Sequence, residues 1–205
     1  MQVAALLGDV VGSRQVVDRG ALQTGLGSLL AEVAGQGATR IQMTIGDEFQ
    51  GRYRSLAEAV SDSLDLHLGS VGLARLRIGI GWGDLALDAG PDTQFGQDGP
   101  AWWRARDAIE SLEEMSGPAR TLIVTDTGWD EMFNQYLMLR DGLLDDLDEI
   151  DCAIARGMLA GRTQRDMAGV LGLHESSVSR RVSGHHINIL VGVARPRIPG
   201  FGSTQ

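Results

Sequence analysis

The stretch QRDMAGVLGLHESSVSRRVSG, residues 164–184, decides the fold of the C-terminal part of the chain. Its apolar side chains fall at helical spacing on two short segments. They are Met167, Ala168 and Leu171 in the first segment, and Val178 and Val182 in the second. Between the segments, Gly172 allows a tight turn because glycine adopts a positive φ at little cost, and Glu175 or Ser176 can start the second helix. The spacing therefore predicts a helix-turn-helix.

The side chains left on the outer faces of this predicted motif suit a nucleic acid. Hydroxyl and guanidinium groups bind phosphates and base edges. The candidate DNA-binding residues are Arg162, Gln164, Arg165, Ser176, Ser177, Ser179, Arg180 and Arg181. Double-stranded DNA is therefore the expected partner, although a structural helix pair that never touches DNA would show the same pattern.

Charge is divided unevenly along the chain. Residues 1–150 contain 11 arginines and 24 acidic residues, a net charge of −13, whereas residues 151–205 contain 7 arginines and 3 acidic residues, a net charge of +4. DNA binding depends on the field of the contacting face rather than on the total charge of −9. The basic C-terminal part is therefore the part expected to meet DNA.

Composition excludes several other classes of protein. The chain contains no lysine, so it has no P-loop lysine, Schiff-base lysine or Ser-Lys dyad. Its single cysteine, Cys152, cannot form an intrachain disulfide. No apolar run approaches the length of a membrane span, and the first residues lack the basic lead of a signal peptide. We therefore expect a cytoplasmic protein with no membrane partner.

The N-terminal part alternates strands and helices. The hydrophobic pattern predicts strands at residues 2–8, 39–45, 49–54, 74–82 and 120–125. It predicts helices at residues 18–34, 55–69, 100–115 and 127–139. The resulting order is βαββαβ followed by αβ. This order predicts an antiparallel α+β sandwich with helices on one face.

Carboxylates from two distant segments are expected to meet in this sheet. Asp9 closes the first strand, and Asp47 and Glu48 lie at the tip of the predicted hairpin, which neighbours that strand. Carboxylates at one point repel unless they share a divalent cation, and Mg²⁺ prefers such hard oxygen ligands together with phosphates. A metal-nucleotide site is one interpretation. The other is that Asp9 caps a turn while Asp47 and Glu48 occupy a solvated hairpin tip.

Four segments of this region form a recognisable series. They are GDVVGSR (8–14), IGDEFQG (45–51), RIGIGWG (77–83) and QDGPAWWRAR (97–106). Together they resemble the SatD family, whose function is poorly defined. More distantly they are similar to the class III nucleotide cyclases and the GGDEF diguanylate cyclases, whose catalytic core is a ferredoxin-like fold. The resemblance covers residues 1–130.

The resemblance implies roles for several residues. Asp9 and Asp47 match the two metal-binding aspartates of the cyclases, and Glu48 matches the acidic residue that follows the aspartate in GGDEF. The loop matching the phosphate-binding loop contains Val10, Val11, Gly12 and Ser13. Backbone amides of such a loop bind anions because their dipoles are already oriented. Mg²⁺ and a nucleotide are the ligands that the resemblance implies.

The departures from the cyclase pattern argue against turnover. The purine-selecting lysine would fall near Met43, and Trp102 and Trp103 occupy the region of the transition-state asparagine. Arg106 lies close to the position of the catalytic arginine and is the candidate catalytic residue if the protein is active. Loss of one transition-state contact costs on the order of 10² in rate. We therefore expect binding of a nucleotide without conversion.

These observations predict three parts of the chain. Residues 1–140 form a nucleotide-cyclase-like α+β domain, residues 141–150 an acidic linker, and residues 151–205 a small all-α helix-turn-helix domain with a tail. The predicted function is a DNA-binding transcription regulator that acts as a homodimer, whose cyclase-like domain binds a metal-nucleotide or mediates dimerisation. The alternative is a Mg²⁺-dependent nucleotide cyclase or dinucleotide synthase.

Overall fold

A five-stranded sheet forms the centre of the computed structural model, which describes residues 1–34, 41–86, 98–196, 198, 200 and 201. Its strands are β1 (Gln2–Val10), β2 (Ile41–Met43), β3 (Phe49–Tyr53), β4 (Leu76–Asp84) and β5 (Thr121–Val124). They lie in the order β2-β3-β1-β4-β5, and only β4 and β5 run parallel among these pairs. Residues 39 and 40 of the predicted second strand, Gln97 and residues 202–205 lie outside the described residues.

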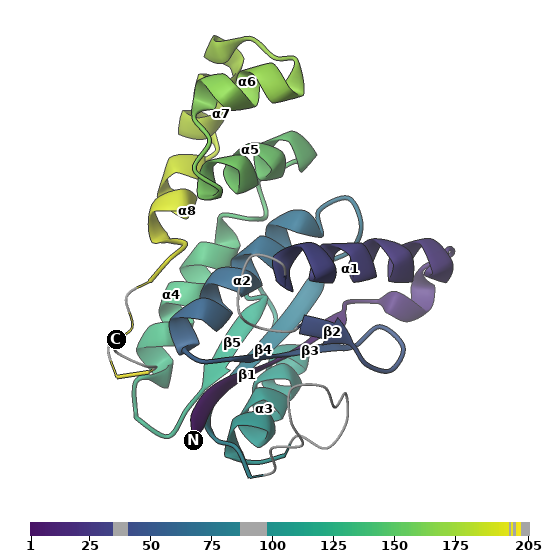
Figure 1. Cartoon of the computed structure of the whole chain (residues 1–205), viewed down its shortest axis with the longest axis vertical. Coiled ribbons are helices and arrows are strands. Elements are labelled where there is room, and N and C mark those ends of the chain that lie inside the picture. The colour runs from purple at the N-terminus through teal and green to yellow at the C-terminus, as the bar shows by residue number, and fades with distance from the viewer. Residues whose placement is uncertain (35–40, 87–97, 197, 199, 202–205) are drawn as a thin grey trace.

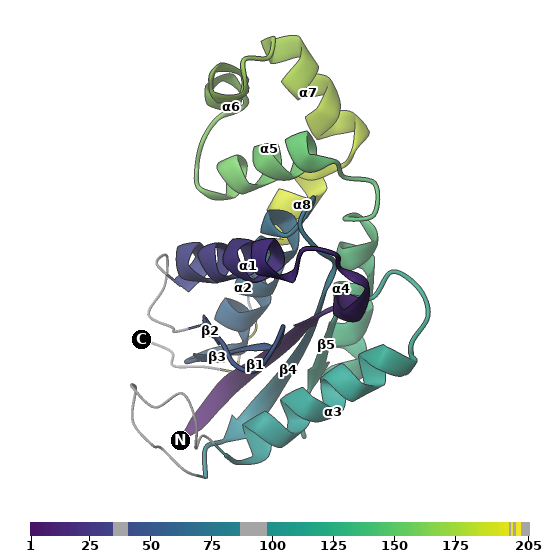
Figure 2. The same ribbon diagram turned by 90° about the vertical axis from the view of Figure 1, so that its right-hand side faces the viewer.

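Helices cover both faces of this sheet. Those of the N-terminal part are α1 (Arg19–Ala34), α2 (Leu56–Gly69), α3 (Pro100–Glu114) and α4 (Asp130–Gly142), with a short 3-10 turn, η1 (Ser13–Gln15). The predicted order of strands and helices is confirmed. The prediction that the helices lie on one face is wrong, because α1 and α2 cover one face while α3 packs on the other (Figures 1 and 2).

The reason for the second helical layer lies in the alternation along β4. Ile78 and Ile80 point into the core beneath α1 and α2 and are fully buried. Gly79 and Gly81 alternate with these isoleucines, and a Cβ atom at Gly81 would lie 2.0 Å from the carbonyl oxygen of Ala101 in α3. Glycine in a strand interior permits such a close approach of another backbone. The hydrophobic pattern that predicted a strand at residues 74–82 gave no indication of this second helical layer.

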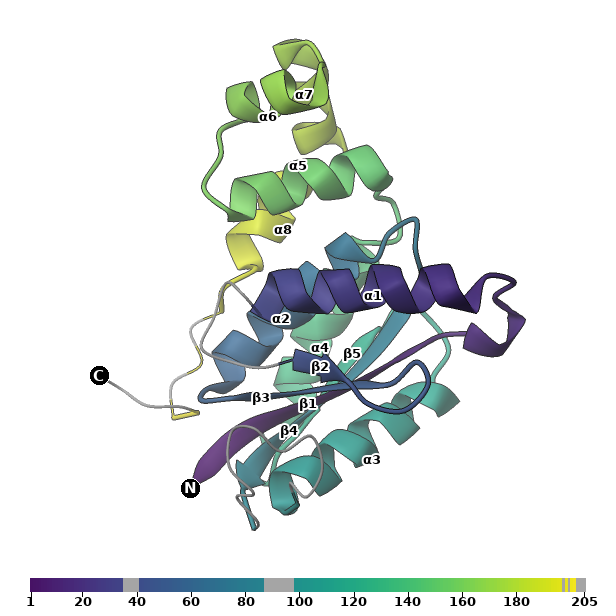
Figure 3. The same ribbon diagram turned by 45° about the vertical axis from the view of Figure 1, so that its right-hand side comes forward.

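Four further helices stand at one end of the molecule. They are α5 (Glu149–Leu159), α6 (Gln164–Leu171), α7 (Glu175–Gly184) and α8 (Ile187–Val193). Figure 3 shows them stacked beyond α1 and α2. Their apolar core includes Ile154, Met167 and Val178, and it continues into Leu64 and Leu68 of α2. None of the helices in the described part of the chain is long and apolar enough to cross a membrane.

The segment between α4 and α5 takes part in this packing. Leu144 and Leu147 are buried in the same core as the C-terminal helices. Asp141, at the end of α4, is fully buried, and its Oδ2 accepts hydrogen bonds from the backbone N–H groups of Arg120 and Thr121 at 2.8 and 2.7 Å. Residues 141–150 therefore include core side chains as well as exposed acidic ones.

Candidate functional site

A pocket of about 380 Å³ lies at the end of β1, beside the β2–β3 hairpin. The predicted site residues that line it are Asp9, Val10, Gly12, Ser13, Asp47 and Glu48. They meet because β1 pairs with β3, with Gly8 opposite Phe49, so that the next residue of β1 faces the hairpin. The structure thus brings the two acidic segments together, as expected from a strand lying beside the hairpin.

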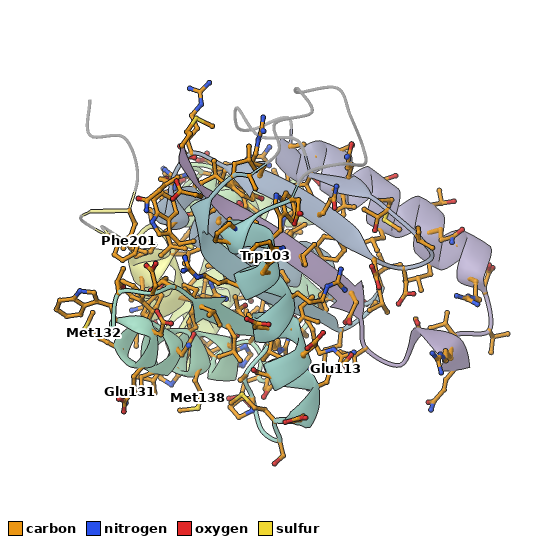
Figure 4. All side chains as sticks on the ribbon, turned by 90° about the horizontal axis from the view of Figure 1, so that it is seen from below. Trp103, Glu113, Glu131, Met132, Met138 and Phe201 are labelled. Carbon is orange, nitrogen blue, oxygen red and sulfur yellow. The ribbon has the colours of Figure 1, made fainter. Side chains whose placement is uncertain are left out.

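An arginine that we had not predicted also lines this pocket. Arg77 lies opposite Asp9 in the β1–β4 ladder, and its Nε and Nη2 atoms donate to the two oxygens of Asp9 at 2.9 and 3.1 Å. Nη2 also lies 3.0 Å from Oε1 of Glu113, near the C-terminal end of α3 (Figure 4). A guanidinium group is suited to this two-point contact because its N–H groups form a planar fork. The Arg77 guanidinium therefore pairs with two carboxylates of the pocket, Asp9 and Glu113.

The Asp9 carboxyl experiences opposing influences. Burial raises its pKa above the ordinary value, since the charged form loses solvation, and the contact with Arg77 partly counteracts this. Glu113 and Asp47 raise the pKa of Asp9 further through repulsion. The net result is a pKa of Asp9 above its ordinary value.

The side chains in the pocket do not fit a shared Mg²⁺ ion in this arrangement. Both oxygens of Asp9 are engaged by Arg77. Within the described ranges, no three His, Cys, Asp or Glu side chains come close enough to hold one ion. Mg²⁺ requires oxygen ligands near 2.1 Å in octahedral geometry, and a guanidinium on one ligand opposes this. We therefore assign no chemical step to a metal.

The predicted phosphate-binding loop follows β1 into the pocket. Gly12 has a left-handed conformation, with φ of 70°, and Ser13 behind it is buried. Val11 does not line the pocket, and its N–H donates to the carbonyl oxygen of Arg75 at 2.8 Å. That amide is already used within the protein, which leaves fewer amides for an anion than we expected.

Three residues of α3 were also compared with the cyclases: Arg106, Trp102 and Trp103. Arg106 is exposed on α3 and lines a small cavity of about 20 Å³ that shares Asp9 and Glu48 with the pocket. Trp102 is buried against the sheet, whereas Trp103 points outward and donates from Nε1 to Asp98 at 2.7 Å. The two tryptophans therefore face opposite sides of α3.

The α6–α7 region forms the second candidate site. Thr163 caps α6 together with Asp166, and α6 ends at Gly172 in the left-handed conformation, with φ of 64°. The cap of α7 is His174, whose Nδ1 accepts from the N–H of Ser176 at 3.3 Å. We had predicted that Glu175 or Ser176 starts α7. The observed cap, His174, lies one residue before Glu175. An imidazole nitrogen here takes the place of the usual hydroxyl or carboxylate cap.

The predicted DNA-binding side chains differ in accessibility. The exposed ones are Arg162, Arg165, Ser176, Ser179 and Arg180. Gln164 and Ser177 are half-buried. Arg165 lies on the surface with its Nε 3.0 Å from Oε1 of Glu175, an ion pair that water screens. Among the exposed side chains, Ser176, Ser179 and Arg180 fall on one face of α7, because they are three and four residues apart.

Arg181 has a different environment from its neighbour Arg180. Its Nη1 donates to Asp148 and to Asp151, both at 2.8 Å. Asp151 is fully buried, and its other oxygen lies 2.6 Å from Nδ1 of His185. Sequence reasoning had grouped the two arginines as equivalent, because adjacent charged residues give no signal of which one points inward.

A buried polar network near β5 was also missed. Arg140 in α4 is 1% exposed and donates to Asp141, to Thr121 and to groups of α2. Nε2 of His67 lies 2.8 Å from Oγ1 of the same threonine. Burial lowers the pKa of His67 to about 3, so this side chain is neutral at pH 7. An arginine in a largely polar helix gave no sign that it would be buried.

Comparison with solved structures finds nucleotide cyclases. A bacterial light-regulated adenylyl cyclase is 16% identical, with a TM-score of 0.47, over 60% of this chain and 74% of that one. The guanylyl cyclase Cya2 is 14% identical, with a TM-score of 0.45, over 60% and 74%. An adenylate/guanylate cyclase/hydrolase from Silicibacter pomeroyi is 21% identical, with a TM-score of 0.43, over 57% and 71%.

Sequence comparisons give one further result. No curated protein shows a significant match. The pattern of the SatD family matches residues 3–195, which include the pocket at the end of β1 and all four C-terminal helices. The chain belongs to the SatD family.

Proposed function

We propose that the protein binds double-stranded DNA through α6 and α7 and regulates transcription. The observation that carries this proposal is the pair of short helices joined at Gly172, whose left-handed conformation turns the chain sharply. Met167, Ala168, Val178 and Val182 are buried on the inner faces of the pair. In a helix-turn-helix the second helix enters the major groove and its N-terminal residues reach the bases. This role is assigned to α7.

The chemistry of the outer face supports a nucleic acid. Ser176, Ser179 and Arg180 are exposed on α7, and Arg165 is exposed on α6. Hydroxyls can contact phosphates or bases, and a guanidinium can bind guanine at two points. The net charge of +4 in residues 151–205 favours approach of this end of the molecule to DNA, since the larger part carries −13.

We assign the pairing of two copies to the sheet-containing part, residues 1–140. Residues 141–150 connect it to the DNA-binding part, residues 151–205. Trp129, Met132 and Leu139, near and on α4, are each more than half exposed. Figure 4 shows Met132 and Met138 projecting from α4 at the edge of the molecule. Large exposed apolar side chains on one helix are typical of a protein contact. Two half-sites also give the buried area that tight operator binding needs.

The metal-nucleotide form of the proposal is less well supported. The pocket contains the expected loop and carboxylates, but Arg77 engages Asp9, and the described part of the chain offers no three-ligand cluster. The same observations disfavour a Mg²⁺-dependent cyclase or dinucleotide synthase. The proposed regulator therefore requires no metal for DNA binding.

The test is selection of binding sites from a pool of random duplexes, followed by fluorescence anisotropy on the enriched sequence. We expect Arg180→Ala to weaken specific binding about tenfold, the size of one lost base or phosphate contact. Arg54→Ala is a matched control, since Arg54 is exposed at the opposite end of α2 from the C-terminal helices. An absence of any enriched duplex, or equal losses in both variants, would contradict the proposal.

A further inference from the structure

We propose that Arg181 positions α7 and does not contact DNA: together with Asp151 it clamps α7 onto the start of α5, so that Arg180 is the arginine presented outward. This inference rests on the proposed function and deepens it. It divides the two adjacent arginines of the predicted DNA-binding set into a contact residue and a positioning residue.

The clamp is built from the C-terminal end of α7 and the N-terminal end of α5. Nη1 of Arg181 lies 2.8 Å from Oδ1 of Asp151 and 2.8 Å from Oδ2 of Asp148. Nδ1 of His185, the C-terminal cap of α7, lies 2.6 Å from the other oxygen of Asp151. A single carboxylate thus binds the last turn of α7 at two points.

Because Asp151 is buried, loss of its contact with Arg181 is costly in free energy. The Asp151 side chain is fully buried, whereas that of Asp148 is 55% exposed. A buried carboxylate that loses its cation is strongly unfavourable, because nothing replaces the water it gave up. Asp148 and Asp151 also form the capping box of α5, where the helix dipole favours negative charge. Arg181 therefore binds two carboxylates, Asp148 and Asp151, that the capping box of α5 already holds in place.

The clamp determines which arginine faces solvent. Successive residues of a helix point about 100° apart, so Arg180 and Arg181 leave α7 in different directions. Val178 and Val182 are buried on the inner side, and Arg181 lies beside them toward α5. Arg180 then remains exposed, with its Nε 3.4 Å from the carbonyl oxygen of Ser176 in its own helix.

Salt dependence separates a positioning residue from a phosphate contact. Each phosphate contact releases counterions and contributes about 0.9 to the slope of log K against log salt. We expect Arg180→Gln to lower both the affinity and the slope. We expect Arg181→Gln to lower the affinity about tenfold, comparable with one lost contact, while the slope stays as in the unchanged protein. A slope reduced by about 0.9 in Arg181→Gln would overturn the inference.

Asp151→Asn provides the matched variant, since a carboxylate cannot contribute a phosphate contact. It should reproduce the loss of affinity of Arg181→Gln at unchanged slope, and an affinity equal to that of the unchanged protein would contradict the clamp. Arg181→Lys keeps the charge and one nitrogen that can donate to both carboxylates, as Nη1 of Arg181 does, so it should recover part of the affinity at an unchanged slope. If it recovers affinity and slope together, phosphate contact is indicated instead.

Hydrogen exchange of the free protein tests the clamp without DNA. Amide protection in α7 should fall in Arg181→Gln and in Asp151→Asn, and stay unchanged in Arg180→Gln. Equal protection in all three variants would overturn the clamp even if the protein binds DNA. If the unchanged protein selects no duplex, the proposed function fails, and a loss of protection in these variants would still show the clamp.

Discussion

Two arginine–carboxylate pairs in this protein have the same chemistry and opposite surroundings. Arg77 and Asp9 meet at the open pocket, where their side chains are 23% and 17% exposed. Arg140 and Asp141 meet between α2, α4 and β5, where both are fully buried. The difference teaches that burial, and not the pairing itself, decides what such a pair can do. Solvent reaches the open pair, whereas the buried pair fixes structure.

The hydrogen-bond partners of the two pairs agree with this division. Arg140 donates to Val60, Ser63 and Thr121, besides Asp141, so its guanidinium is surrounded by protein acceptors. In the pocket, Arg77 donates to Asp9 and lies beside Glu113, which is about half exposed. Water can therefore replace a partner in the pocket but not beside β5.

The largest expected effect comes from breaking the buried pair. Arg140→Ala should lower the free energy of unfolding by about 3–5 kcal/mol, because it leaves Asp141 charged and buried. For a chain of this length that corresponds to a fall in Tm of roughly 6–20 °C. Thermal unfolding followed by circular dichroism measures it. A fall of less than about 3 °C would show that the buried pair contributes little more than the open one.

The second prediction concerns pH and the histidine of the same network. Burial lowers the pKa of His67 from 6.5 to about 3, so the unfolded state binds a proton more readily than the folded state. The stability that this group contributes is present above pH 6.5 and is lost as the pH falls toward 3, at up to about 1.4 kcal/mol per pH unit. His67→Gln removes this dependence.

The measurement is urea unfolding of His67→Gln and of the unchanged protein between pH 7 and pH 4.5. Burial raises the pKa of Asp62 to about 6, which has the opposite sign, since it favours the folded state as the pH falls. Because Asp62 is present in both proteins, its contribution cancels in the difference. A difference between the two proteins that is constant with pH would contradict a neutral, buried His67.

The third prediction is a smaller effect at the open pair. Arg77→Ala should lower the free energy of unfolding by about 1 kcal/mol or less, because solvent reaches the pocket. It should also raise the pKa of Asp9 further, since burial already raises it and Arg77 acts against that rise. Urea unfolding and a carboxyl titration by NMR measure the two effects. If Arg77→Ala lowers the free energy of unfolding as much as Arg140→Ala does, burial does not distinguish the two pairs.

The smallest expected effect is that of divalent metal. Because Arg77 engages both oxygens of Asp9, adding Mg²⁺ should change neither Tm nor DNA affinity beyond what NaCl of equal ionic strength does. Adding EDTA should likewise leave both unchanged. A Mg²⁺-specific rise in Tm that disappears in Asp9→Asn would show that the ion displaces Arg77, and it would restore the metal-nucleotide form of the proposal.

Much of the local structure could be predicted from the sequence. Hydrophobic periodicity placed the strands and helices near their observed positions, because it reflects which side chains must leave water within one element. The strand order that brings Asp9 near Asp47 and Glu48 could also be predicted, since a βαββαβ chain has few ways to close its sheet. The second helical layer could not, because it depends on the close approach of the α3 backbone to Gly79 and Gly81, which only packing shows.

The sequence by itself determined the elements, the family resemblance and the uneven charge, since each is a property of neighbouring residues or of composition. Only the tertiary structure decided the partners of the charged side chains. It placed Arg77 on Asp9, buried Arg140 with Asp141, and turned Arg181 inward while Arg180 stayed exposed. The physical reason is that an ion pair depends on the distance and burial of two groups that are far apart in sequence, and only packing sets both.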